Sequence, residues 1–282
     1  MRARIPPQAS LHSWAVEPLA PVWRSSTVEP QRAGRRTTAR VVLENRGGAT
    51  WRSRGEQGLQ LSYHWLDRHG NAIIWDCERT PFPRPVAPGE VVALEVPLDA
   101  PRPPGRYVLR FDLVEEHAFW LSEAGVATHD VDVDVAPLIA ERRLGVVVHG
   151  GVDAATAAAL EAQEEPLVDD APAAIAHLVT GAVPAPDWSR LLLDAHAEGW
   201  PAVGPAIMPE GRLWERRRAA RHYRSWAPGG RNPRLDSPLL LPSLVVGVEP
   251  AEHDGLPAFR GEGLFEGAAV VRLPTRSGRP LR

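Results

Sequence analysis

The residues with the clearest chemical potential stand near the C-terminus, where Glu266 is followed by Gly267 and Ala269. Carboxylates at such positions could hold a divalent cation, because hard cations bind clusters of oxygen ligands. Gly267 and Ala269 supply no side-chain oxygen, so Glu266 stands alone. Glu266 is the candidate catalytic residue, although an isolated glutamate in an exposed loop is more often merely solvated. The segment therefore predicts an enzyme-like site whose chemistry has been lost.

A second group of polar residues follows two strand-like apolar runs. His149 and two glycines come directly after the run 144–148, and Asp169 and Asp170 follow a shorter run. Aspartates here could contact a nucleoside, and glycines allow a backbone to approach phosphate. Two ordinary interpretations compete, namely Asp170 as the N-cap of a helix beginning near Pro172 and the glycines as a tight turn. His149, Asp169 and Asp170 are the candidate nucleotide-binding residues.

The chain contains 10 tryptophans, which form the third class of candidates. An indole can stack on a sugar ring, but it more often fills a core. Trp51, Trp75 and Trp120 are the candidate glycan-binding residues, on condition that they are exposed. Trp65 lies inside an alternating apolar stretch and is expected in the core.

Metal binding has no support from the sequence. The single cysteine, Cys77, excludes an intrachain disulfide and a cysteine-based zinc site. The histidines of the first half are scattered and form no ligand-like pair on one element. We therefore expect no metal and no other cofactor. These histidines are His64, His69, His117 and His129.

The elements that position these residues differ between the two halves of the chain. Residues 21–136 alternate apolar and polar side chains with period two, and the runs are separated by turns rich in glycine and proline. The spacing leaves no room for crossover helices. It predicts an all-β, immunoglobulin-like sandwich of about seven strands. Residues 1–20 read as a disordered arm.

After a linker at 137–143, residues 144–282 predict a small α/β domain. The run 144–148 is continuously apolar, as in a strand covered on both faces. A helix should follow Asp153, and Pro172–Val179 and the segment after Pro186 read as further helices. Strands are expected near 166–170, 202–208 and 239–248, and an exposed arginine-rich helix near 215–226.

The first half resembles the immunoglobulin-like modules of the four-tryptophan kind and those attached to bacterial glycosyltransferases and polysaccharide-export proteins. The resemblance rests on framework residues, so it supports the fold strongly and a ligand weakly. The framework residues are Leu43-Glu-Asn-Arg-Gly-Gly-Ala-Thr-Trp51, Leu61-Ser-Tyr-His-Trp65, Pro88-Gly-Glu and Pro104-Gly-Arg-Tyr107.

The second half resembles a compressed, degenerate family 2 glycosyltransferase of the GT-A type. The resemblance rests on four segments, which are Val146-Val-Val-His-Gly-Gly, Glu165-Pro-Leu-Val-Asp-Asp170, Leu178 to Trp188, and Phe265 to Arg272 with Ser277-Gly-Arg-Pro-Leu281. Such enzymes bind a nucleotide sugar through paired aspartates and a metal-binding Asp-x-Asp. The resemblance therefore implies that the nucleotide contacts are Asp169 and Asp170.

The departures from that pattern concern the catalytic positions. Val179 and Gly181 occupy the metal-motif positions, and Gly267 and Ala269 stand where a second acidic pair would lie. None of these side chains can bind a hard cation. We therefore expect a pseudoenzyme, in which catalysis has been lost.

Composition limits the partners and the location. A formal net charge of −3 and a pI near 6.4 give no electrostatic footprint for nucleic acid. The start lacks a signal peptide, and no apolar run is long enough to span a bilayer. The expected location is cytoplasmic, with peripheral contact to the inner membrane as an alternative.

These observations predict a glycosyltransferase-related, non-catalytic accessory protein that binds a glycan or a partner in bacterial envelope polysaccharide assembly. Two alternatives stay open. One is an active, metal-independent glycosyltransferase that uses a nucleotide sugar, with Glu266 and Asp170 sharing the roles of base and nucleotide ligand. The other is a scaffold that binds proteins. Exposed aromatic side chains on the sandwich would favour glycan binding. A cleft lined by Asp169, Asp170 and Glu266 would favour the active enzyme, and a large apolar patch would favour the protein-binding scaffold.

Overall fold

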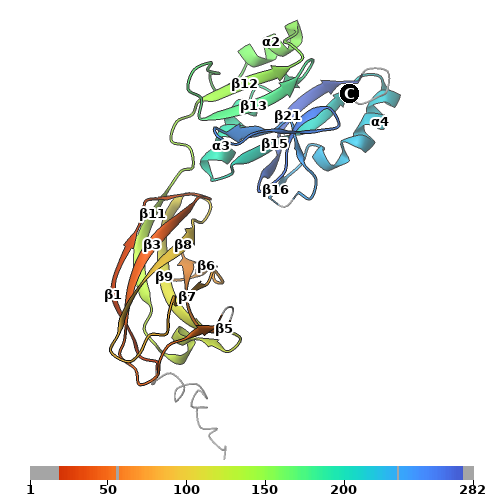
Figure 1. Cartoon of the computed structure of the whole chain (residues 1–282). Helices are drawn as coiled ribbons and strands as arrows, with labels where there is room; N and C mark the ends of the chain where they lie inside the picture. The colour runs from red at the N-terminus through yellow and green to blue at the C-terminus, as the bar shows by residue number, and fades with distance from the viewer. Residues whose placement is uncertain (1–18, 55–56, 234, 276–282) are drawn as a thin grey trace, which may run out of the picture. The chain divides into compact units, whose positions relative to one another are not determined.

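The computed structural model describes residues 19–54, 57–233 and 235–275 (Figure 1). The predicted arm 1–20 lies almost wholly outside the described residues, as does the segment Ser277–Leu281. The chain divides into two compact units, one formed by residues up to 101 with 105–136 and the other by 102–104 with 137–282.

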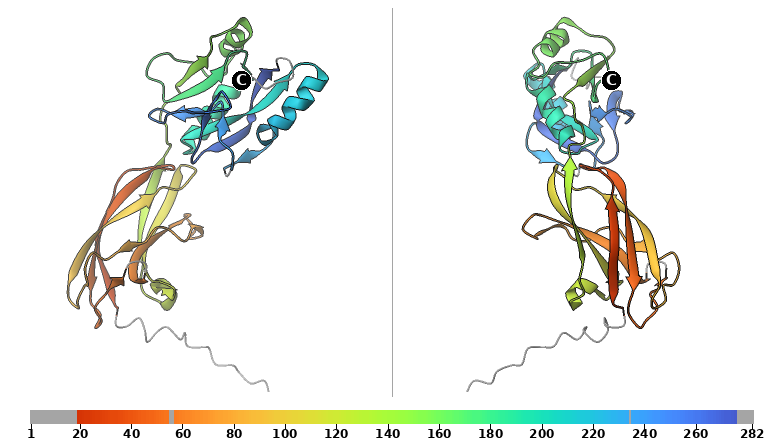
Figure 2. Two further views of the ribbon diagram at one scale, coloured as in Figure 1. Left: turned by 45° about the vertical axis from the view of Figure 1, so that its right-hand side comes forward. Right: turned by 90° about the vertical axis from the view of Figure 1, so that its left-hand side faces the viewer.

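The first unit is a β-sandwich of the predicted immunoglobulin-like kind. Its smaller sheet has the antiparallel order β1-β3-β8 and its larger sheet the order β2-β11-β9-β5-β4, with further short strands on β9 and β5. Figure 2 shows the two layers facing each other. The strands are β1 (Pro21–Val28), β2 (Gln31–Arg32), β3 (Arg36–Asn45), β4 (Ser53–Arg54), β5 (Gln57–Leu66), β6 (Ala72–Ile74), β7 (Thr80–Pro81), β8 (Val91–Asp99), β9 (Gly105–Glu115), β10 (Phe119–Trp120) and β11 (His129–Ala136).

The period-two pattern places one face of each long strand in the core. On β5, Leu61, Tyr63 and Trp65 point inward, and Trp65 has no exposed surface. Its indole N–H donates to the Asp99 carbonyl at 2.9 Å. Trp65 is therefore a core residue, as the alternation predicts.

The opposite face of the larger sheet is also covered. Ser62 and His64 on β5 and Asp112 on β9 should face solvent by alternation, yet all three are buried. The segment 67–82, which runs back along β5 as β6 and β7, lies next to them, and β10 with the short helix η1 (Leu121–Ala124) follows β9. A second, polar layer thus forms on this side of the sandwich.

The second unit contains a mixed seven-stranded sheet, with β12-β13-β18-β15-β21-β14 in order and β16 also on β21. The strands β12, β13, β15 and β21 run in one direction. The bounds are β12 (Leu144–His149), β13 (Ala174–Val179), β14 (Val183–Pro184), β15 (Ala202–Glu210), β16 (Arg231–Asn232), β18 (Ser243–Val245) and β21 (Leu264–Pro274), and a small sheet adds β17 (Leu239–Leu240), β19 (Ala251–His253) and β20 (Leu256–Phe259).

Three α-helices accompany this sheet, α2 (Ala154–Glu161), α3 (Trp188–Ala197) and α4 (Leu213–His222). The predicted cap of α2 is confirmed, because the Asp153 carboxylate accepts a hydrogen bond from the Thr156 N–H at 2.8 Å. The short helix η2 (Arg224–Trp226) follows α4. Among the described residues, no helix is both long and apolar enough to cross a membrane.

The predicted helix at Pro172–Val179 is wrong. Ala174–Val179 is the strand β13, which pairs in parallel with β12 and is almost completely buried. The alanine content favoured a helix, but burial on both faces of a central strand selects small and apolar residues as well. The predicted strand at 166–170 is reduced to one isolated bridge, between Leu167 and Leu144.

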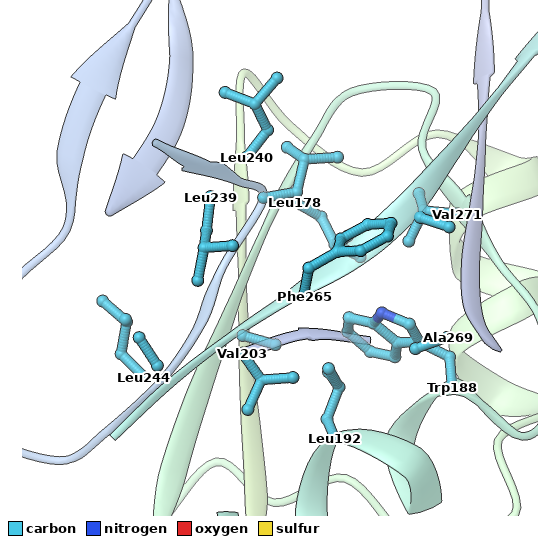
Figure 3. Close-up of a cluster of buried hydrophobic side chains, with 14 of the residues drawn as sticks. Leu178, Trp188, Leu192, Val203, Leu239, Leu240, Leu244, Phe265, Ala269 and Val271 are labelled. Carbon is cyan, nitrogen blue, oxygen red and sulfur yellow. The ribbon is translucent and has the colours of Figure 1, made fainter. Parts of the chain in front are cut away.

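The core of the second unit gathers side chains from α3 and from several strands. Figure 3 shows Trp188 and Leu192 of α3 together with Leu239 of β17 and Phe265 of β21. Trp188, Leu192 and Ala269 have no exposed surface. The segment that includes Ala269 therefore serves the packing of the unit.

Candidate functional site

Two of the three candidate tryptophans meet on the covered side of the sandwich's larger sheet. Trp75 follows β6, Trp120 belongs to β10, and their ring centroids lie 5.9 Å apart. His64 from β5 and Arg79, just before β7, complete the group. We call these four residues, Trp75, Trp120, His64 and Arg79, the Trp75 platform.

The rings of the platform hold Trp75 in one orientation. The His64 ring stacks on the Trp75 ring with centroids 3.9 Å apart and planes 12° apart. Trp120 meets the edge of His64 at 4.4 Å. The Arg79 guanidinium lies over the Trp120 ring at 4.7 Å, in cation–π geometry. The indole of Trp75 is thus supported from within the protein.

Hydrogen bonds fix the same group. The Nδ1 of His64 donates to the Trp75 carbonyl, which can only accept, so this nitrogen carries the proton. The other ring nitrogen, Nε2, lies 3.6 Å from Oδ2 of Asp112, with both side chains buried. Arg79 donates from Nε to the Glu116 carboxylate at 2.5 Å and from Nη1 to the Cys77 carbonyl at 2.7 Å. Backbone and side chain of the Trp75 segment are therefore both anchored.

Exposure separates the three candidate tryptophans. Trp75 is 39% exposed and Trp120 is 9% exposed, whereas Trp51 is completely buried. The indole N–H of Trp51 donates to the Leu19 carbonyl at 2.7 Å. The prediction that Trp51 contacts a glycan is therefore wrong, because its ring fills the core. Trp75 alone offers a substantial free surface.

The residues next to Trp75 in the sequence are also exposed. Asp76 is largely exposed and pairs with Arg79 at 2.6 Å. Ile73 and Ile74 of β6, which precede Trp75, are 49% and 39% exposed. The segment that carries Trp75 thus presents both polar and apolar side chains to solvent.

Sequence reasoning missed His64, Arg79 and Asp112. It treated His64 as one of several scattered histidines, because the partners of this ring lie on three other segments. One signal was present, since His64 and Ser62 occupy the polar positions of β5 while Asp112 occupies a polar position of the neighbouring β9. The burial of that face could not be read from the alternation.

The residues predicted to bind a nucleotide do not converge. His149 ends β12, whereas Asp169 and Asp170 follow Val168, whose N–H binds the carbonyl of Leu144 at the start of that strand. A strand of this length separates its ends by about 17 Å. His149 therefore does not form one site with Asp169 and Asp170.

Asp170 is also not a helix cap, because β13 follows it. Its side chain is 90% exposed and pairs with Arg143 at 3.1 Å. Asp169 lies in the same exposed bend. Asp170 thus forms a surface ion pair and does not cap a helix.

Glu266 lies inside β21 and is only 6% exposed, so the expectation of a solvated loop residue is wrong. Its Oε2 pairs with Nε of Arg231 at 2.8 Å. Arg231 also pairs with Glu198 at 2.6 Å. The buried carboxylate of Glu266 is therefore held by the partly exposed guanidinium of Arg231, an unfavourable arrangement for a general base.

The positions equated with lost carboxylates are packed. A Cβ at Gly267 would lie 2.5 Å from the Gly229 carbonyl oxygen, and one at Gly181 would lie 2.8 Å from Pro274. Val179 and Ala269 belong to the core. Tight backbone contacts and core packing thus explain the residue types at all four positions.

Among the described residues of the second unit, one histidine pairs with another histidine and one pairs with a serine. Nε2 of His149 and Nδ1 of His177 lie 3.1 Å apart, and burial, together with the charge of His149, lowers the pKa of His177. His196 donates from Nδ1 to the Trp200 carbonyl and accepts at Nε2 from the Ser243 hydroxyl at 2.8 Å. The His196–Ser243 pair has no exposed surface, so no substrate can reach it. Among the described residues no group of three donors could hold a metal ion.

No protein-family model matches the chain, and a search of curated proteins finds no match. Several solved all-β domains are similar to part of it. The C-terminal domain of Wzt is 9% identical, with TM-score 0.30, over 41% of this chain and 73% of that domain. A CARDB domain from Pyrococcus furiosus is 16% identical, with TM-score 0.26, over 41% of this chain and 93% of the other. A PapD-like domain of human CEP192 is 12% identical, with TM-score 0.22, over 48% and 92% of the two chains.

Proposed function

We propose that this chain is a non-catalytic glycan-binding accessory protein and that its sandwich binds a sugar ring on Trp75. The observation that carries the proposal is the His64–Trp75 stack, at 3.9 Å and 12°, beneath an indole that is 39% exposed. The stability of the fold does not require an exposed indole to be held in one orientation. An indole that is already held loses less conformational entropy when a ligand binds to it.

The chemistry of the surroundings fits a sugar. The flat indole offers dispersion contacts to the C–H groups of a pyranose ring. Asp76 and Arg79 provide an acceptor and donors beside it, and both are fixed by their mutual ion pair at 2.6 Å. This combination of an apolar platform with oriented polar groups is what a small polar ligand requires.

The non-catalytic part of the proposal rests on the second unit. Glu266 is paired with Arg231 in a buried site, and Asp169 and Asp170 lie near the opposite end of β12 from His149. The proposed role in bacterial envelope polysaccharide assembly rests on the sequence pattern of this half alone, which resembles that of a GT-A-type glycosyltransferase. In that role the unit would keep the order of the segments that resemble the enzyme but would not transfer a sugar.

A second candidate function is protein binding at the same edge. Ile73 and Ile74 are exposed beside Trp75 on the short strand β6, which pairs with β5. A partner strand could add to such an edge and cover these side chains. In that case Ile73→Asp would remove binding and soluble polysaccharides would have no effect.

Affinity electrophoresis tests the glycan proposal. The full chain is run through gels that contain soluble glucans, mannans or galactans, beside the variants Trp75→Ala and Trp214→Ala. Trp214 is the matched control, because it is an exposed tryptophan in the other unit. We expect one polysaccharide to retard the unmodified chain and Trp214→Ala but not Trp75→Ala. Equal retardation of all three proteins, or of none in any gel, would reject the proposal.

A further inference from the structure

The helix α4 and the residues that flank it carry an unusual concentration of unpaired positive charge. Residues 212–224 contain six arginines and one acidic residue, Glu215, which gives 6 − 1 = +5 in a chain whose formal net charge is −3. All six side chains are exposed. We call these residues the α4 arginines, and they are Arg212, Arg216, Arg217, Arg218, Arg221 and Arg224.

None of the α4 arginines forms an ion pair with any residue that the structure describes. Arginines elsewhere in the same unit do pair, for example Arg142 with Glu165 at 2.6 Å. The acidic residues closest in the chain are engaged elsewhere. Glu215 accepts from the Arg212 backbone N–H at 2.9 Å, and Glu210 pairs with Arg272 at 3.0 Å. The helix therefore presents its positive charge outward.

Large apolar side chains project from the first turn of the same helix. Leu213 is 74% exposed and Trp214 is 56% exposed, and Met208 at the end of β15 is 37% exposed. Only Ala219 of α4 is buried, so the helix contacts its unit along a narrow line. Burying Leu213 and Trp214 in an apolar environment would be favourable by the hydrophobic effect.

A shallow hollow of about 380 Å³ lies between α4 and β15. Its lining is largely aliphatic and includes Ile207, Met208 and Leu213, while Arg216 and Arg217 stand at its edge. An apolar floor with guanidinium groups beside it matches a molecule that has an aliphatic part next to an anionic group. Figure 1 shows α4 on the outside of its own unit, along β15.

We propose that α4 docks this protein on an anionic phospholipid surface. The arginines would contact lipid phosphates, and Trp214 and Leu213 would enter the interfacial layer, where indoles are favoured. A nucleic acid would use the same charges and could stack on Trp214. The hollow and Leu213 favour lipid, since the lining is mostly aliphatic and Tyr223 is its one aromatic residue among those that the structure describes. The α4 arginines belong to the second unit, whereas the Trp75 platform belongs to the sandwich.

Vesicle co-sedimentation of the full chain tests the proposal. The protein is mixed with vesicles of phosphatidylcholine alone or with about one third phosphatidylglycerol, at low and at high salt. We expect binding to the anionic vesicles only, and release by salt. Each arginine near such a surface contributes about 1 kcal/mol, or roughly fivefold in partitioning. The double variant Arg217→Glu with Arg221→Glu should therefore bind at least ~25-fold more weakly.

Matched variants separate this docking from a general charge effect. Arg35→Glu with Arg52→Glu changes the net charge equally, on exposed arginines of the sandwich, and should bind as the unmodified chain does. Brominated lipids should quench the fluorescence of the unmodified chain more than that of Trp214→Phe. Equal binding to neutral vesicles, unchanged binding after the α4 reversals, or binding to a single-stranded oligonucleotide without binding to anionic vesicles would each overturn the proposal. Trp75→Ala should leave vesicle binding intact, which keeps this test independent of the glycan test.

Discussion

At the scale of single residues, groups that could do chemistry are mostly used for structure. His196 and Ser243 have the geometry of a base and a nucleophile, but both are buried and they tie α3 to β18. Burial lowers the pKa of His196 to about 4, because the charged ring cannot be solvated there. The neutral ring is therefore the form that the folded protein requires.

This buried histidine predicts acid sensitivity of the second unit. An unfolded histidine has a pKa near 6.5, so between about pH 6.5 and 4 the unfolded state binds more protons than the folded state. Stability should be complete above this window and should fall as the pH decreases through it, by an amount on the order of 3 kcal/mol. Hydrogen exchange of the β18 and α3 amides at pH 7 and pH 5 measures this loss. His196→Gln should reduce the pH dependence, whereas His253→Gln, at a partly exposed site, should not. A loss of protection that is identical in both variants would contradict this account.

Gly267 gives a second test at the residue scale. A Cβ there would lie 2.5 Å from the Gly229 oxygen, whereas one at Gly230 meets no atom within 4 Å. Gly267→Ala should therefore destabilise the second unit by about 1–3 kcal/mol, and Gly230→Ala should be nearly neutral. Chemical denaturation of both variants provides the comparison. A tolerated Gly267→Asp that binds manganese would instead favour a lost carboxylate and the enzyme alternative.

At the scale of elements, the sandwich strands could be predicted because alternation reports one buried face. The layer beneath Trp75 could not, since Ser62 and His64 occupy polar positions and are buried because the segment 67–82 folds back over this face and Trp120 of β10 packs on His64. In the second unit, Pro172–Val179 was predicted as a helix because continuous burial removes the periodicity that distinguishes a strand. The predicted nucleotide site does not form, because the segment 166–170 makes only one parallel bridge, at the start of β12, while His149 lies at the end of that strand.

Trp65 on β5 provides the prediction at this scale. It has no exposed surface, and its indole donates to Asp99. Trp65→Ala should cost about 3–5 kcal/mol of sandwich stability, while Ile73→Ala on the exposed strand β6 should stay within about 0.5 kcal/mol. Denaturant unfolding of the two variants tests this difference. A neutral effect of Trp65→Ala on stability would contradict the conclusion that the indole fills the core.

At the scale of the whole molecule, the chain combines a sandwich that carries the Trp75 platform with an α/β unit whose acidic residues are paired or dispersed. Residues 21–136 contain a complete set of paired strands and their own core. The fragment 1–136 should therefore melt cooperatively with a β-rich circular dichroism spectrum. An unfolded fragment at ambient temperature would contradict this independence.

The central claim is that a sugar ring binds to Trp75 without catalysis, and calorimetric titration tests it most directly. Oligosaccharides from the polysaccharide retained in the gels are titrated into the unmodified chain and into Trp75→Ala, with and without a chelator. We expect the variant to lose at least about tenfold in affinity, or 1.4 kcal/mol, as is usual for a central tryptophan contact. The chelator should have no effect, and the oligosaccharide should be recovered unchanged. Equal affinity of the two proteins, or conversion of the sugar, would contradict the account.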